Sequence, residues 1–347
     1  MKRSWRFWIV LAVACAPAWA AFAAAPEPTP VTPVLVAAAR AEGRVVFYTS
    51  IEVRLAESLG HAFEAKYPGV AVQVERTGAE RVFQRVAQEY GSNVHAVDVV
   101  ESSDVGHAFA WKREDLLAPF VPEDAARWPA DERDPDGCFA ADRVTLQVMG
   151  YNTKLVQPAA APRSFADLLD PKWRGKIVKA HPGYSGSVMT ATFEMSRALG
   201  WEYFEKLSRQ RVMQAQSGTE PPKKLALGER PVMVDGAEYV MWSLRAAGNP
   251  VAIVYPSEGT PLIVGSAAVM RAAPHPNAAR LFLEYLFSQD GQQLMVEEGG
   301  LRSFHPGVKE LPGRPALGDL KLMTASPAEL EQAVEEVRKK YAEYFGT

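Results

Sequence analysis

Cysteine is almost absent from this sequence of 347 residues, which contains only Cys15 and Cys138. The motifs Gly-x-Ser-x-Gly, His-Glu-x-x-His and Cys-x-x-Cys are missing. They would mark a hydrolase nucleophile, a zinc protease, and a dithiol or metal site. The formal net charge is −3, and no Lys/Arg-rich tract of the kind that binds nucleic acid is present. The sequence thus argues against these enzyme classes and against a nucleic-acid partner.

Long apolar runs are also missing, apart from residues 7–16 near the N-terminus. A positively charged start precedes this run, and small residues after it offer cleavage sites near Ala20 or Ala23. A run of about ten apolar residues is too short to span a bilayer but suits an export signal. We therefore predict a signal peptide over residues 1–23, with an N-terminal anchor helix as the alternative. A second alternative is lipidation of Cys15, although Ala12 occupies the position where a lipoprotein box usually has Leu.

Removal of the signal peptide would leave Cys138 as the only cysteine, so no intramolecular disulfide could form. Residues 24–33, rich in Ala, Pro and Thr, are expected to be a flexible tail. The sequence predicts a periplasmic, monomeric protein without a cofactor.

The remaining chain alternates between strand and helix patterns, with 48% apolar and 23% charged residues, which is typical of a globular protein. Residues 34–150 are predicted to form the first part of one lobe, including a single strand over 144–151. Residues 151–250 form a second lobe, and residues 251–347 return to complete the first. The expected fold is α/β, with two lobes that each have a mixed sheet flanked by helices. Two strand-like crossings join the lobes and act as a hinge.

Polar residues cluster where predicted strands end and helices begin. In an open α/β sheet this is the ligand-binding edge, because free backbone N–H groups and helix dipoles point there. The candidate ligand-binding residues are Thr49, Ser50, Ser102, Ser103, Ser185, Gly186, Ser187, Asp235, Glu238 and Tyr239. The alternative is that some of them only cap helices. Thr49 with Glu52 matches a capping box, and Ser103 or Asp104 could cap the next helix.

Several motifs resemble the extracellular solute-binding proteins of ABC importers, with the type 2 periplasmic binding fold. They include residues 46–50 (VFYTS), 98–103 (DVVESS) and 170–176 (DPKWRGK). Residues 275–282 (HPNAARLF) and 288–292 (SQDGQ) match best. The resemblance covers the mature chain and is closest to the ferric-iron-binding subgroup. It implies two lobes that close on a solute and then dock on an ABC permease in the inner membrane.

The ferric subgroup typically presents a Tyr-Tyr pair in the second lobe, with a His after the first strand and a Glu after the third. Here the pair corresponds to residues 237–240, where only Tyr239 remains, next to Glu238. The His position falls near Glu52 and the Glu position on Ser103. Tyr239 and Glu238 are therefore the candidate metal ligands if Fe(III) is the transported solute.

Hydroxyl side chains and helix N-termini suit a carboxylate, phosphate or phosphonate better than a bare metal ion. Two ligand classes stay open: a small organic or phosphorylated anion, and Fe(III), free or chelated. A solute sensor that reports to a membrane receptor would have the same fold. An exported hydrolase with a Ser–His–Asp set assembled from scattered residues is the remaining alternative; otherwise no enzymatic activity is expected.

Overall fold

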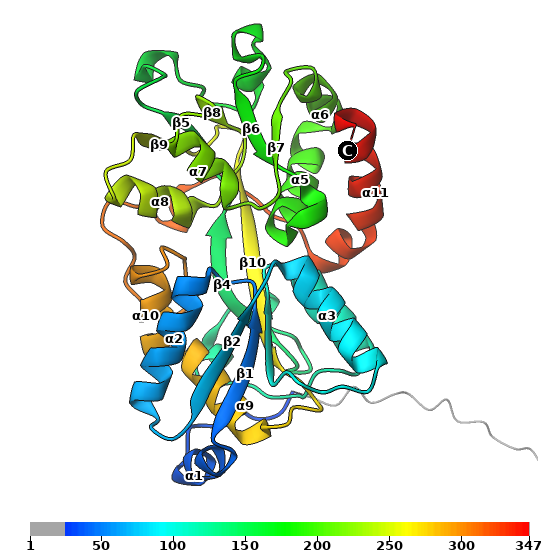
Figure 1. The fold of residues 1–347 in the computed structure, drawn as a ribbon, viewed down its shortest axis with the longest axis vertical. Coiled ribbons are helices and arrows are strands. Elements are labelled where there is room, and N and C mark those ends of the chain that lie inside the picture. Colours follow the sequence, from blue (N-terminus) through cyan, green and yellow to red (C-terminus); the bar gives the residue numbers. More distant parts are fainter. Residues whose placement is uncertain (1–24, 347) are drawn as a thin grey trace, which may run out of the picture.

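The computed structural model describes residues 25–346, which form two α/β lobes, one above the other in Figure 1. The predicted signal peptide and the possible lipidation of Cys15 lie outside these residues. Residues 25–32 contain no helix or strand, and the Thr29 N–H donates to the Val121 carbonyl at 3.3 Å. None of the helices in residues 25–346 is both long and apolar enough to cross a membrane.

The first lobe, at the bottom of Figure 1, contains a sheet with strand order β11-β10-β3-β1-β2, and β4 pairs with β10. Strands β1, β2 and β3 are parallel, whereas β10 is antiparallel to β3 and β4. The strands are β1 (Arg44–Thr49), β2 (Ala71–Arg76), β3 (Val99–Ser102), β4 (Ala140–Leu146), β10 (Thr260–Val269) and β11 (Leu322–Met323). The helices are α1 (Pro33–Glu42), α2 (Val53–Lys66), α3 (Ala79–Gly91), α4 (Val105–Arg113), α9 (Pro276–Phe287) and α10 (Gln289–Glu297).

The second lobe has a sheet with strand order β7-β6-β8-β5-β9. Its strands are β5 (Met149–Asn152), β6 (Ile177–Ala180), β7 (Met213–Ala215), β8 (Val232–Met233) and β9 (Val251–Val254). Its helices are α5 (Gly186–Leu199), α6 (Trp201–Ser208), α7 (Glu220–Ala226) and α8 (Glu238–Ala246), together with the short 3-10 turn η6 (Pro182–Tyr184). Both lobes are thus mixed sheets flanked by helices, as predicted.

Two strand crossings connect the lobes, and they run side by side. The predicted strand over 144–151 is in fact two strands, because β4 belongs to the first sheet and β5 to the second. At the break, the Gln147 N–H donates to the Pro261 carbonyl at 3.0 Å, and the Val148 N–H donates to the Gly236 carbonyl at 2.9 Å. The strand-like pattern of residues 144–151 continues through this break, so the sequence did not show that the strand passes from one sheet to the other at Gln147. The paired crossings β4–β5 and β9–β10 make the expected hinge.

Two elements from the last part of the chain differ from the prediction that residues 251–347 return to the first lobe. Strand β9 pairs with β5 in the second sheet. The C-terminal helix α11 (Pro327–Phe345) packs on α5 and α6 of the second lobe (Figure 1). Its apolar stripe, including Leu330 and Val337, is buried against Met189 and Phe193. Burial of that stripe requires an apolar surface, and the sequence pattern does not say which lobe supplies it.

The core of the first lobe fixes the strand that leads into the cleft. Phe47 of β1 meets Phe282 of α9 edge to face, with ring centroids 5.0 Å apart, and Phe63 of α2 meets the same ring at 5.1 Å. All three rings are fully buried. Because this aromatic burial holds one face of β1 against α2 and α9, the end of β1 at Thr49 is firmly placed.

Candidate functional site

A cavity of about 390 Å³ lies between the lobes, at the carboxyl ends of β1, β2 and β3. The first lobe contributes Ser50, Arg76, Gly78, Ala79, Glu80, Arg81, Gln84 and Ser103, and β4 contributes Arg143 and Thr145, followed by Gln147. The second lobe contributes Gly183, Tyr184, Ser185, Gly186, Ser187, Gln216, Ser217, Gly218, Thr219, Glu220, Ala237 and Tyr239. The position matches the expected ligand-binding edge of an α/β sheet.

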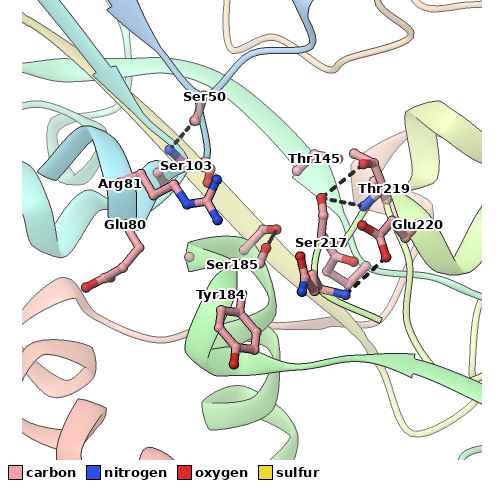
Figure 2. Close-up of a pocket in the computed structure, with 18 of the residues that line it drawn as sticks. Ser50, Glu80, Arg81, Ser103, Thr145, Tyr184, Ser185, Ser217, Thr219 and Glu220 are labelled. Carbon is pink, nitrogen blue, oxygen red and sulfur yellow. Dashed lines mark hydrogen bonds between the residues drawn. The ribbon is translucent and has the colours of Figure 1, made fainter. Parts of the chain in front are cut away.

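Six of the ten residues singled out in the sequence line this cavity. They are Ser50, Ser103, Ser185, Gly186, Ser187 and Tyr239. They come from both lobes, so the fold brings together segments that are far apart in the sequence. The Ser103 hydroxyl faces the cavity from the end of β3, and Figure 2 shows Ser50, Ser103 and Ser185 around the same space.

Thr49 and Ser102, two of the predicted ligand-binding residues, do not line this cavity, because protein groups take up their side chains. The Thr49 hydroxyl donates to Glu101 Oε2 at 2.7 Å and accepts from the Ile51 N–H. The predicted capping box with Glu52 is wrong, because Glu52 itself is the N-cap of α2. Strand β3 extends to Ser102 and buries this side chain completely.

The hydrolase alternative would need a Ser–His–acid set, and Ser102 belongs to a set of this kind. Its Oγ lies 2.8 Å from His107 Nδ1, and His107 Nε2 lies 3.5 Å from Glu80. Ser102 nevertheless has 0% of its surface exposed, and its Oγ accepts the N–H of Asp104. Ser102 also does not line the cavity, so a molecule held there would not contact this hydroxyl. Asp104 caps α4 in place of Ser103.

Asp235 and Glu238 are likewise absent from the cavity wall, because buried cations hold them. Asp235 lies 2.7 Å from Lys179 Nζ, and both side chains are fully buried. Glu238 accepts from Arg302 Nε and Nη2, each at 2.9 Å, and from the Tyr255 hydroxyl at 2.6 Å. Both Glu238 oxygens thus accept hydrogen bonds from protein groups, and Glu238 does not face the cavity as the predicted iron ligand would.

Glu101, which the sequence reasoning missed, organises the end of β1. It is fully buried and accepts from the Thr49 hydroxyl and the Ser50 N–H, each at 2.7 Å. Arg143 donates to it from Nε at 2.9 Å and from Nη2 at 2.7 Å. Both nitrogens donate to the same oxygen, Oε1, and such charge-assisted hydrogen bonds are shorter and stronger than neutral ones. Glu101 therefore positions both the β1 tip and the Arg143 guanidinium.

The Ser50 hydroxyl is also held by protein groups. It donates to Glu101 and accepts from the Ser103 N–H and from Arg143 Nη2, each at 2.9 Å. A hydroxyl has one hydrogen and two lone pairs. The bonds to Glu101, Ser103 and Arg143 use all three, so Ser50 orients neighbouring groups and has little capacity left for a ligand.

Three arginines line the cavity, and they differ in their partners. Arg143 is paired with Glu101, and Arg76 Nε donates to the Ile51 carbonyl at 3.1 Å. Arg81, exposed in the first turn of α3, has no ion pair or hydrogen bond from its guanidinium to any described residue. Figure 2 shows the Arg81 side chain extending into the cavity from the side of Ser50 and Ser103. The cavity thus contains a positive charge free to meet an anion.

Three helices of eight or more residues begin at the cavity without a side-chain cap. Their N-caps are Gly78 for α3, Ser185 for α5 and Ala237 for α8. The Ser185 hydroxyl bonds with that of Ser187 at 3.1 Å instead of capping α5. Uncapped N-termini leave backbone N–H groups without intrahelical partners and carry partial positive charge. Together with Arg81 they make the wall of the cavity attractive to anions.

Tyr239 reaches the cavity from α8, near the arginines. Burial raises the pKa of its phenol above the usual value, while Arg143 and Arg76 act in the opposite direction. The phenol therefore remains protonated at neutral pH in the absence of a metal. Among residues 25–346, no three of the His, Cys, Asp and Glu side chains are grouped closely enough to hold a metal ion.

A sequence signal existed for two of the missed residues. Arg81 lies in the first turn of a helix, where the helix dipole disfavours a cation. Asp142-Arg143 places two charges inside a strand whose pattern is otherwise apolar. Residues that oppose local preferences in this way often mark functional sites. No comparable signal pointed to Thr145, Gln147 or the loop 216–220.

The match to known proteins can be judged against this geometry. Residues 49–293 match the model of the family described as bacterial extracellular solute-binding protein. The chain belongs to that family. The solved structures agree on the two-lobe fold. This solute-binding protein superposes on the periplasmic binding protein AfuA of Actinobacillus pleuropneumoniae, with fructose-6-phosphate bound, at a TM-score of 0.80. The match is 22% identical and covers 88% of this chain and 99% of AfuA.

Iron-binding proteins also resemble this solute-binding protein. Iron-bound HitA from Pseudomonas aeruginosa matches at a TM-score of 0.75 and 19% identity, covering 86% of this chain and 99% of HitA. Iron uptake protein A2 of Synechocystis is 28% identical over 271 residues, which are 72% of this chain and 76% of that protein. A Salmonella typhimurium periplasmic protein named for binding 2-aminoethylphosphonate is 25% identical over 246 residues, or 67% of this chain and 69% of that protein. The predicted family and fold are thus confirmed.

Proposed function

We propose that this protein captures a small organic anion in the periplasm and delivers it to an ABC permease in the inner membrane. The anion would carry a phosphate, phosphonate or carboxylate group. The observation that carries the proposal is the unpaired Arg81 guanidinium in a cavity where three helices begin without side-chain caps. An anion would accept hydrogen bonds from these backbone N–H groups and from Arg81.

The roles of the remaining cavity residues follow from their bonding. Ser103, Ser185, Gly186 and Ser187 would contact the anion, with Ser103 and the two second-lobe serines as hydroxyl donors. Ser50, Glu101 and Arg143 would position the β1 tip and supply background positive charge. Contacts from both lobes would make binding depend on closure, because only the closed form offers all of them.

Fe(III) is the solute suggested by the names of several relatives, and a chelated form fits this cavity better than the free ion. Glu238 is held by Arg302, and only Tyr239 of the predicted metal pair lines the cavity. A ferric chelate would present its own anionic groups to Arg81. The same protein could also report its solute to a membrane receptor; loss of uptake in a deletion strain would identify the import role.

Native mass spectrometry with metal analysis of the purified protein would identify a solute carried through purification. Titration calorimetry with a panel of organic phosphates, phosphonates and carboxylates then tests the anion site. Arg81→Met should weaken binding at least about tenfold, since a hydrogen bond to a charged group contributes about 1.5–3 kcal/mol. Arg85→Met is the matched control, because Arg85 lies one turn further along α3 and pairs with Glu75 and Glu89. Equal affinities for the Arg81 variant and the wild type would overturn the proposal.

A further inference from the structure

The cavity is much larger than the anionic group that Arg81 would hold. Its volume of about 390 Å³ has room for about a dozen water molecules at 30 Å³ each. An inorganic phosphate or a bare metal ion would fill only a small part of it. A solute that filled this cavity would have a body as well as a charged group, and the wall away from Arg81 would contact that body.

Two buried polar side chains at the crossing strand lack any partner. Thr145 and Gln147 line the cavity, with 4% and 1% of their surfaces exposed. The Thr145 hydroxyl and both the oxygen and the nitrogen of the Gln147 amide make no hydrogen bond to any described residue. Leaving such a group buried and unsatisfied costs about 1–3 kcal/mol. Groups with this cost are expected where a ligand supplies the missing partner.

The neighbours of Thr145 and Gln147 are small and polar. A Cβ atom added at Gly218 would lie 3.5 Å from the Gln147 amide nitrogen and 3.1 Å from the Ser187 hydroxyl, so the loop 216–220 passes directly over this part of β4. The Ser217 and Thr219 hydroxyls on that loop bond to each other at 3.0 Å. Figure 2 shows Thr145, Ser217 and Thr219 on one side of the view and Arg81 on the other.

The two ends of the cavity differ in charge. Arg81 and the α3 N-terminus lie at one end, whereas the carboxylate of Glu220 lies beside Thr219 at the other (Figure 2). Thr145 and Gln147 are themselves neutral and can both donate and accept hydrogen bonds. An amide with an adjacent hydroxyl suits the hydroxyl groups of a polyol. It offers nothing to an alkyl chain, whose burial here would leave the polar atoms unsatisfied.

We infer that Thr145 and Gln147 form a second subsite that binds the hydroxylated body of the solute. The solute class is then a polyol or sugar that carries a phosphate or carboxylate, bound with its charge at Arg81 and its hydroxyls at β4. This inference rests on the proposed anion function and specifies its substrate class.

The test compares a hexitol phosphate with an alkyl phosphate of the same chain length, and gluconate with hexanoate. Thr145→Val and Gln147→Met keep the side-chain shape and remove the polar atoms. Each should weaken binding of the hydroxylated ligands about tenfold, from the loss of buried hydrogen bonds, and leave the alkyl ligands unchanged. Since the replaced atoms have no protein partner, the unliganded variants should unfold at the same denaturant concentration as the wild type or a higher one.

The outcomes separate the two proposals. Equal binding of hydroxylated and alkyl ligands by the wild type, both weakened by Arg81→Met, overturns the β4 subsite and leaves the anion site standing. A loss of affinity in the Thr145 and Gln147 variants that is the same for both ligand types also overturns it. If the wild type binds neither the phosphates nor the carboxylates, the anion proposal fails, and the subsite inference fails with it.

Discussion

Glu80 of the first lobe and Arg338 of the C-terminal helix form an ion pair across the cleft, with Oε1 and Nη2 3.2 Å apart. Glu80 also lines the cavity, and a hydrogen bond from His107 holds its pKa below the usual value. A second pair, Arg113 with Glu331, joins α4 to α11. Because α11 packs on the second lobe, these pairs connect the lobes at the side of the cleft where α3 and α11 meet.

Arg338→Met should weaken solute binding by at most about fivefold at low salt, because exposed ion pairs contribute about 0.2–1 kcal/mol. The difference from the wild type should shrink at high salt, where screening removes the attraction. Calorimetric titrations at two salt concentrations check this. Lys340→Met is the control, since Lys340 pairs with Glu343 on the same helix and forms no ion pair with the first lobe within residues 25–346. A salt-independent loss would contradict the ion-pair explanation.

Gly186→Ala should weaken binding about tenfold or more without unfolding the protein. A Cβ atom at this position would lie 2.8 Å from the Cβ of Asp104 and 3.4 Å from that of Ala79, both in the first lobe. Steric overlap of this kind costs about 1–3 kcal/mol and would oppose closure. X-ray scattering with and without solute would report the reduced closure. Gly91→Ala is the control, since a Cβ there meets nothing within 4 Å. Normal closure of the Gly186 variant would refute this role.

Glu238→Gln should lower the free energy of unfolding by about 3–5 kcal/mol, because it leaves Arg302 buried without its counter-charge. Both side chains are 1% exposed. Replacing both residues, as in Glu238→Gln with Arg302→Met, should recover part of the loss, and denaturant unfolding measures both. An unchanged stability together with lost iron binding would restore Glu238 as a metal ligand.

The stability of the protein should fall as the pH rises from about 4.5 to about 8, in part because of Glu284 on α9. The pKa of this carboxyl is raised to about 8, chiefly by burial; the hydrogen bond from the Glu123 N–H acts against this rise, and the negative charges of Glu123 and Asp124 add to it. The folded state therefore keeps a proton that the unfolded state loses in this range. The stabilisation is complete below the unfolded pKa and is lost as the pH passes the folded one.

Glu284→Gln should remove this part of the pH dependence and make the protein more stable than the wild type at pH values near 8. Thermal unfolding across the pH range checks the prediction. Glu297→Gln, at an exposed position that bonds Gln293, is the control and should leave the curve unchanged. If the stability of the wild type and that of the Glu284 variant changed with pH in parallel, the pKa of Glu284 would lie outside this pH range.

The sequence was a good guide where one local pattern decides the structure. Residues 44–49 form a strand and residues 53–66 a helix, in keeping with the predicted alternation of strands and helices, because apolar spacing and a polar strand end specify them together. The sequence was a poor guide where the place of an element depends on the surface against which it packs. The stripe on α11 and the strand β9 fit either lobe by pattern alone, and only packing assigned them to the second.

The polar residues at the ends of strands indicated where the cavity lies, but not which of those residues face it. Thr49 and Ser50 are adjacent, yet strand alternation turns Thr49 to Glu101 and leaves Ser50 on the cavity wall. Asp235 and Glu238 were predicted to contact the ligand. In the structure they form buried ion pairs with Lys179 and Arg302, which lie far from them in the sequence. Such pairings depend on tertiary contacts that no spacing rule encodes.

Strand β10 comes late in the chain but lies between β3 and β4 in the first sheet. A chain synthesised or threaded from its N-terminus therefore cannot complete that sheet until residues 260–269 arrive, and long-range pairing of this type slows folding. The second lobe also waits for α11 to cover Met189 and Phe193. Both lobes thus stay incomplete until the last quarter of the chain has emerged, so neither lobe can reach its final packing before the other.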